Sequence, residues 1–489
     1  MTTTPLPVTD FSQIHIGTGG TFSPSGKFSS VAADIDALFA YLSEKDTDTL
    51  ILYFHGGLVP EASGMAATAV ITQHFSRMEE KRHAVSFVWE TGPAEILLEQ
   101  LDKAAMQVKS GLYKELINFV IKLVAGKLGK VPDAKGNGVY LSDEAIEEEK
   151  TKEAPFEELD THDGTKGGSP LADAEADEDV ERAQLEMESR ILVMSSASDE
   201  LLAALEEEAA MEEGKGFLSL GLIKLVAETA FQVLRRFRRH THHDFYPTIT
   251  EELFRKLGVG AAGTWGWNAI KQKAADMFAD NTGLSGTGLH AGRYFLERLQ
   301  AHYAASMQQN KPFSIHLIGH SAGSIVICHL LRQAMRSYPD LRFKLVALLA
   351  PACRTDLFME TIPAAREQGC YQQLRLFTMR EENEKKDHCI PYVYTHSLLY
   401  LVSGLFEADT SGEPAPDTRI LGLHEQFRSE GRYADDPLLQ SLKTFLQEHC
   451  TVILSDDIDN PEINRRCSAL KHGDFDDNEL TLTSILLSI

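Results

Sequence analysis

The sequence predicts an α/β protein built around a mostly parallel, doubly wound sheet. Six short runs rich in β-branched and aromatic residues recur along the 489-residue chain, each bounded by turn residues. Helical periodicity alternates with these runs, as expected for a parallel sheet covered by helices. The third observation is a long interruption between the second and third runs, which predicts a large insertion in the sheet domain.

The strands are expected at 49–55, 84–90, 313–319, 343–351, 373–379 and 450–455. Residues 64–81 and 288–307 have helical spacing of apolar positions and are expected to cover the sheet. The segment HIGTGGTF at 15–22 is rich in glycine, but it matches neither the dinucleotide-binding nor the P-loop pattern. We therefore expect a turn there.

More than 200 residues separate the second predicted strand from the third, so the domain is expected in two parts. Residues 1–115 form the first part of the core, 116–245 the insertion, and 246–489 the second part of the core. Within the insertion, 135–215 is acidic and poor in aromatic residues, which is typical of a flexible or loosely helical segment.

One flank of the insertion, 217–243, is an apolar helical segment with a basic end formed by Arg235, Arg236, Arg238 and Arg239. One interpretation is a lid helix that makes peripheral contact with a membrane surface. The other, which we favour, is an amphipathic helix that packs on the core. Lys224 and Glu228 interrupt its apolar run and argue against a membrane span.

The net charge of −25 is concentrated in one segment. Residues 141–215 hold 25 acidic and 6 basic side chains, and therefore 19 of the 25 net negative charges. Nucleic-acid binding requires clustered lysines and arginines, so this class of function is excluded. The six cysteines form no C-x-x-C pair, and the first residues resemble no signal peptide; we expect a cytoplasmic protein.

The third predicted strand is followed at once by a Gly-His-Ser-Ala-Gly turn and a predicted helix. Such a nucleophile elbow lifts its serine above the carboxyl edge of the sheet, and its glycines permit close backbone approach. The predicted nucleophile is Ser321, within a motif completed by Gly319, His320, Ala322 and Gly323. The alternative is a tight turn whose serine only caps the helix.

The first predicted strand ends in a second motif, His55-Gly56-Gly57-Leu58. An attacked carbonyl develops an oxyanion that needs hydrogen-bond donors in place. The motif resembles the HGG-type oxyanion loop of lipases and esterases, which implies donors at the backbone of Gly57 or Leu58 and of Ala322. The alternative is a Gly-Gly turn after a buried strand.

An acidic partner is expected after the fifth predicted strand. Asp387 opens the sequence Asp-His-Cys-Ile-Pro, which resembles the D-x-x-[VI]-P loop that carries the triad aspartate in α/β-hydrolases. A solvated charged loop is the alternative interpretation. Four further carboxylates compete for the role: Glu381, Glu382, Glu384 and Asp356.

The histidine is expected beyond the last strand, where His472 precedes a glycine that lets the loop turn back toward the elbow. The chain has 18 histidines, so position decides between them. His424 and His449 lie before or at the start of the last strand and fit less well. The alternative is a surface histidine without a catalytic role.

The chain order Ser321, Asp387, His472 resembles the α/β-hydrolase superfamily, over roughly 45–115 and 245–489. The chain also resembles large uncharacterised bacterial hydrolases with an acidic insertion. The resemblance implies the α/β-hydrolase fold, with the insertion as a cap that sets substrate selectivity, and catalysis without a metal or organic cofactor. Typical members lack so long an insertion before the elbow.

Three functions are consistent with these motifs. The first is a serine hydrolase of the esterase or lipase type, acting on a small-molecule or lipid ester through an acyl-enzyme. The second is a serine peptidase with the same fold. The third is a catalytically silent scaffold that recruits a partner through its acidic insertion.

Overall fold

The computed structural model describes residues 11–57, 61–76, 81–89, 142–160, 217–409, 412, 415–428 and 430–489, with isolated positions between 99 and 125. The chain divides into two compact units. Unit 1 comprises Met1–Leu98, Trp265–Asp387 and Thr418–Ile489, and unit 2 comprises Glu99–Thr264 and His388–Asp417. Most of the acidic segment 135–215 lies outside the described residues.

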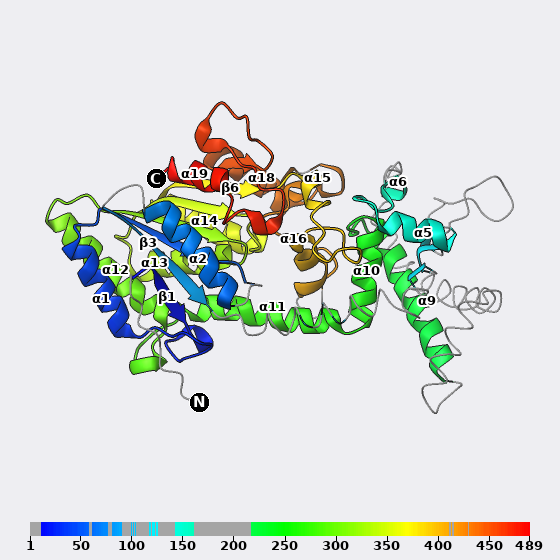
Figure 1. Cartoon of the computed structure of the whole chain (residues 1–489), viewed down its shortest axis with the longest axis horizontal. Helices are drawn as coiled ribbons and strands as arrows, with labels where there is room; N and C mark the ends of the chain where they lie inside the picture. The colour runs from blue at the N-terminus through cyan, green and yellow to red at the C-terminus, as the bar shows by residue number, and fades with distance from the viewer. Residues whose placement is uncertain are drawn as a thin grey trace. The chain divides into compact units, whose positions relative to one another are not determined.

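Unit 1 contains a seven-stranded sheet in which all neighbouring strands are parallel, in the order β1-β3-β2-β4-β5-β6-β7 (Figure 1). The predicted α/β class is thus confirmed. The strands are β1 Gln13–Ile16, β2 Thr49–Phe54, β3 Arg82–Trp89, β4 Ser314–His320, β5 Phe343–Leu349, β6 Tyr371–Thr378 and β7 Thr451–Leu454. All but β1 were predicted, and the expected turn after β1 is the short 3-10 helix η1, Thr18–Gly20.

Helices cover both faces of the sheet. The helices of unit 1 are α1 Ala32–Glu44, α2 Glu61–Ser76, α12 Ala291–Gln308, α13 Gly323–Ser337, α14 Thr355–Glu367, α15 Glu381–Glu384, α17 His424–Arg428, α18 Pro437–His449 and α19 Glu479–Leu486. The chain order along the sheet reverses at β3: β2 leads through α2 to β3, and the chain then crosses back over β2 to reach β4. Because parallel crossovers are right-handed, α2 lies on the face opposite α1, α12 and α13.

Side-chain packing agrees with this layering. On one face, Ile51 and Tyr53 of β2 belong to a buried apolar cluster with residues of α2 and α19. On the other face, Phe54 and Phe87 stack with ring centroids 4.7 Å apart, and Phe87 meets Phe295 of α12 edge-on at 5.0 Å. The central strands are therefore buried on both sides, which explains why they appear in the sequence as mainly apolar runs.

Unit 2 is mainly helical in its described part. Its helices are α5 Asp143–Lys150, α6 Glu157–Asp160, α9 Phe217–Arg238, α10 Phe245–Lys256, α16 Leu398–Leu401 and the π-helix η4 Val402–Phe406, while α11 Val259–Asp276 continues into unit 1 (Figure 1). Asp160 accepts a 2.7 Å hydrogen bond from the N–H of Phe245, at the start of α10. No helix among the described residues is both long and apolar enough to cross a membrane.

The centre of unit 2 is a buried network of charged side chains. Glu251 of α10 is fully buried and pairs with Arg236 of α9 and, at 2.9 Å, with His243 Nδ1. His243 Nε2 lies 3.3 Å from Asp417, and the hydroxyl of Tyr394 donates to Glu251. Of the four arginines in the predicted basic end, Arg236 is thus an internal ion-pair partner, not part of a surface patch. The network joins α9 and α10 to the separate segment 388–417 of the same unit.

Candidate active site

The predicted elbow stands at the carboxyl end of β4, beside the carboxyl end of β2. These two strands are neighbours, with Phe54 paired to Gly319, and the chain leaves them toward opposite faces of the sheet. A crevice at such a topological switch point is the usual place for a ligand in an open α/β sheet. The motifs that follow β2 and β4 both lie at this point of the sheet.

The backbone at Ser321 has the strained geometry of an elbow. Its φ of 51° lies in the left-handed region, which costs free energy for a residue with a Cβ atom. A Cβ atom at Gly323 would lie 2.1 Å from the carbonyl oxygen of Phe54, and one at Gly319 would lie 2.7 Å from Ile327 and 2.8 Å from the Gly323 carbonyl. The glycines on either side of the serine are required by this close packing.

We therefore expect the substitution Gly323→Ala to lower the free energy of unfolding by about 1–3 kcal/mol, because α13 or β2 must shift to relieve the clash. Thermal unfolding followed by circular dichroism measures this change. Gly288→Ala is the matched control, since its added Cβ meets nothing within 4 Å. Equal unfolding temperatures for the two variants would show that the packing at Gly323 is looser than described.

The predicted histidine contacts the predicted nucleophile. His472 begins the short helix η7, His472–Asp474, and its Nε2 lies 3.0 Å from the Oγ of Ser321. Both side chains are buried. Burial and, second, the charge of His320 lower the pKa of His472 to about 3. The imidazole is therefore neutral near pH 7, and in this resting state it is a weaker base than an ordinary histidine.

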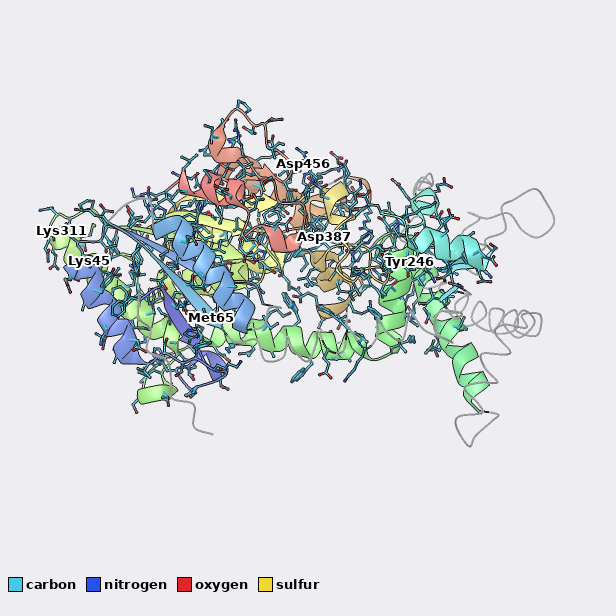
Figure 2. All side chains as sticks on the ribbon, in the orientation of Figure 1. Lys45, Met65, Tyr246, Lys311, Asp387 and Asp456 are labelled. Atoms are coloured by element: carbon cyan, nitrogen blue, oxygen red, sulfur yellow. The ribbon has the colours of Figure 1, made fainter. Side chains whose placement is uncertain are left out.

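Asp387 lies next to His472, but it contacts the main chain. Its Oδ2 accepts a 2.7 Å hydrogen bond from the backbone N–H of His472. Asp387, labelled in Figure 2, follows β6 and α15 in the chain. The ring Nδ1 of His472 is buried and has no hydrogen-bond partner among the described residues. The carboxylate thus holds the histidine in place without a hydrogen bond to its ring.

The competing residues have other surroundings. Glu381 pairs with Lys385 and Arg428, and Asp356 pairs with Arg354. Glu384 is buried on α15, and Glu382 is exposed. His424 is on α17 and His449 ends α18, and no hydrogen bond joins either to Ser321 within the described part of the chain.

The Gly-Gly turn after β2 lies directly against the elbow. A Cβ atom at Gly56 would be 3.3 Å from the Cβ of Ser321, and one at Gly57 would be 2.8 Å from the Cβ of Ala322. Within the described residues, the N–H groups of Gly57 and Ala322 donate no hydrogen bond. Two backbone donors are thereby available beside the serine. Leu58, the other predicted donor, lies outside the described residues.

His55 fixes this turn. Its Nδ1 lies 2.6 Å from the carbonyl oxygen of Gly56, and its Nε2 lies 3.2 Å from the N–H of Trp89 on β3. The indole N–H of Trp89 donates in return to the His55 carbonyl at 3.2 Å. Because Nδ1 donates and Nε2 accepts, the ring is neutral, in agreement with a pKa that burial lowers to about 4. His55 therefore shapes the turn and does not face the serine as a base.

The structure also contains a series of hydrogen-bonded side chains near Ser321 that the sequence did not predict. His320 Nε2 donates to the carbonyl oxygen of His472 at 2.9 Å, and its Nδ1 lies 3.1 Å from Oδ2 of Asp476. The same Oδ2 accepts a 2.6 Å hydrogen bond from the hydroxyl of Tyr53 on β2. Asp476 stands in the acidic stretch after His472, and its position four residues beyond the histidine was the available signal.

The site therefore lies in an α/β unit with a seven-stranded, all-parallel sheet, at the carboxyl edge between β2 and β4. No protein-family model, curated protein or solved structure matches the chain. Among the described residues, no group of three or more histidine, cysteine, aspartate or glutamate side chains is arranged to hold a metal ion.

Proposed function

We propose that this chain is a serine hydrolase related to the α/β-hydrolases, and that it cleaves a carboxylic ester through an acyl-enzyme. The observation that carries the proposal is the 3.0 Å contact between Ser321 Oγ and His472 Nε2, on a strained turn between two glycines. A serine hydroxyl becomes a strong nucleophile when a neutral imidazole accepts its proton. His472 is neutral near pH 7, so its Nε2 lone pair is free to accept the proton, and its pKa of about 3 means that the charged form must be stabilised when substrate is bound.

In the proposed reaction, Ser321 Oγ attacks the ester carbonyl carbon while His472 Nε2 takes the hydroxyl proton. The carbonyl oxygen becomes an oxyanion, which the N–H groups of Gly57 and Ala322 stabilise. Collapse of the intermediate breaks the ester bond, and His472 returns the proton to the departing alcohol. Water then attacks the acyl-enzyme by the same route, releasing the acid and restoring Ser321.

A fluorophosphonate probe, which reacts with activated serines, tests the proposal on the full chain. We expect the native protein to be labelled and Ser321→Ala to remain unlabelled. Ser441→Ala, at an exposed position of α18, is the control and should label at the native rate. Labelled protein should then be tested on short- and long-chain esters and on peptides, with esters expected to be cleaved faster.

One observation favours a second candidate, the silent scaffold. The ring Nδ1 of His472 lacks a hydrogen-bond partner in the described part of the chain, although a triad histidine is normally oriented through this atom. Absence of labelling in a folded native protein would support the scaffold and would contradict the hydrolase.

A further inference from the structure

The main chain of His472 is held from both sides. Its N–H donates to Asp387 at 2.7 Å, and its carbonyl oxygen accepts from His320 Nε2 at 2.9 Å. The side chain has a single hydrogen bond among the described residues, to Ser321 Oγ. Because the ring itself lacks a partner at Nδ1, its direction depends on how firmly the backbone at His472 is fixed.

His320, which donates to the His472 carbonyl, is itself anchored to the sheet. Asp476 lies 3.1 Å from the second nitrogen of His320 and accepts the hydroxyl of Tyr53 at 2.6 Å. Tyr53 is fully buried on the central strand β2, and His320 is the last residue of β4. A continuous path of hydrogen bonds thus runs from two rigid central strands to the loop that carries His472.

We infer that His320 is a positioning residue: anchored by Asp476 and Tyr53, it fixes the backbone carbonyl of His472, and so keeps the His472 ring directed at Ser321. The inference rests on the proposed hydrolase function. It adds His320 as a residue that affects catalysis only through its effect on His472. A misplacement of about 1 Å in a reacting group costs on the order of a hundredfold in rate.

The contacts of His320 also determine its charge. Both ring nitrogens face oxygen acceptors, the His472 carbonyl and the Asp476 carboxylate, so a doubly protonated ring satisfies both. The charged groups and titratable groups around it are Asp476, Asp477, Tyr53, His55 and His472. Burial disfavours the cation, but Asp476 outweighs burial, and the pKa of His320 is raised.

Protonation of His320 bears on the proposed base, His472. The rings of His320 and His472 have centroids 5.2 Å apart, so a proton on His320 opposes a second proton on His472. The base is thereby kept neutral to a lower pH than an isolated histidine would be. Removal of the charge should therefore change the pH profile, an effect that a merely structural side chain would not produce.

The test compares His320→Ala and His320→Gln in the full chain, with kcat and KM measured on an ester that the native enzyme cleaves. The alanine variant should lose about 10- to 100-fold in kcat with KM changed less than about threefold. The glutamine variant keeps a neutral N–H donor and should retain kcat within about fivefold at pH 8. The acid limb of its kcat profile should have its midpoint at a higher pH than that of the native enzyme, because the proton on His320 no longer opposes protonation of His472.

His329→Gln, a substitution further along α13, is the matched control and should leave both parameters and the profile unchanged. If the alanine variant does not fold, the glutamine variant decides, and a pH profile equal to the native one overturns the inference. Labelling by fluorophosphonate separates the two proposals. Equal labelling of native protein and Ser321→Ala overturns the hydrolase, whereas native labelling with an unaltered His320→Ala overturns only the role of His320.

Discussion

Replacement of His472 by alanine is expected, under the proposed hydrolase mechanism, to lower kcat/KM for ester hydrolysis by about 10⁴- to 10⁶-fold. Its Nε2 provides the one hydrogen bond that reaches the Ser321 hydroxyl from the described side chains. Without it, Ser321 keeps its proton, and the serine remains a weak nucleophile. The residual rate should come from the oxyanion donors and from substrate binding, which the substitution leaves in place.

The measurement is steady-state hydrolysis of a chromogenic ester, together with the rate of fluorophosphonate labelling. His424→Ala is a suitable control because His424 is half-buried on α17 and belongs to the same unit. We expect this control to retain native activity. If His472→Ala kept the native rate of hydrolysis and His424→Ala lost it, the base would be His424 and not His472.

In unit 2, the substitution Glu251→Gln is expected to lower the free energy of unfolding by about 3–5 kcal/mol. Glu251 is fully buried between Arg236 and His243 and also accepts from Tyr394. Burial alone would raise its pKa, but Arg236 and His243 outweigh burial and lower it to about 2. Loss of the carboxylate removes the closest anionic partner of the Arg236 guanidinium and leaves it with Glu252 at 3.2 Å, while His243 and Tyr394 lose a charged acceptor in the interior.

Urea unfolding of the full chain, followed by tryptophan fluorescence and circular dichroism, measures this effect. Glu228→Gln is the matched control: Glu228 pairs with Lys256 on the same two helices, but both side chains are partly exposed. Such a pair contributes about 0–1 kcal/mol. Equal losses for the two variants would indicate that Glu251 is better solvated than its burial implies.

The same network predicts how pH affects the stability of unit 2. The stabilisation from Glu251 is complete above its ordinary value of 4.5 and is lost as pH falls toward its folded pKa of about 2. For His243, burial opposes the charge but Glu251 and Asp417 raise the pKa above 6.5. Its contribution is complete below pH 6.5 and is lost as pH rises through the folded pKa. Stability should therefore be greatest between pH 4.5 and 6.5.

The sheet could be predicted from the sequence because its strands are buried on both faces. Each of the six predicted runs is mainly apolar, and this pattern is local. The strand β1 was not predicted because it has only four residues and lies at the edge of the sheet, where a single neighbour, β3, pairs with it. The position of β1 depends on its pairing with β3, and the sequence of the β1 segment alone does not indicate this partner.

The candidate site could be predicted only in part for a related reason. The serine turn and the glycine turn are compact motifs whose geometry is encoded within a few residues. The chain from Tyr53 through Asp476 to His320 joins residues more than 150 positions apart, and no spacing rule connects them. The same holds for the segment 388–417, which joins unit 2 through contacts such as that of Tyr394 with Glu251.

The pairing of β2 with β4 has a consequence for biosynthesis. Phe54 and Gly319 are register partners at the centre of the sheet, yet they lie 265 positions apart in the chain. At about 5–20 residues per second, a ribosome takes roughly 13 to 53 s to make the intervening segment. Throughout that time the nascent β2 has an apolar edge without its final neighbour, and such an edge is prone to pair with other chains. The protein should therefore depend on chaperones most strongly during the translation of its insertion.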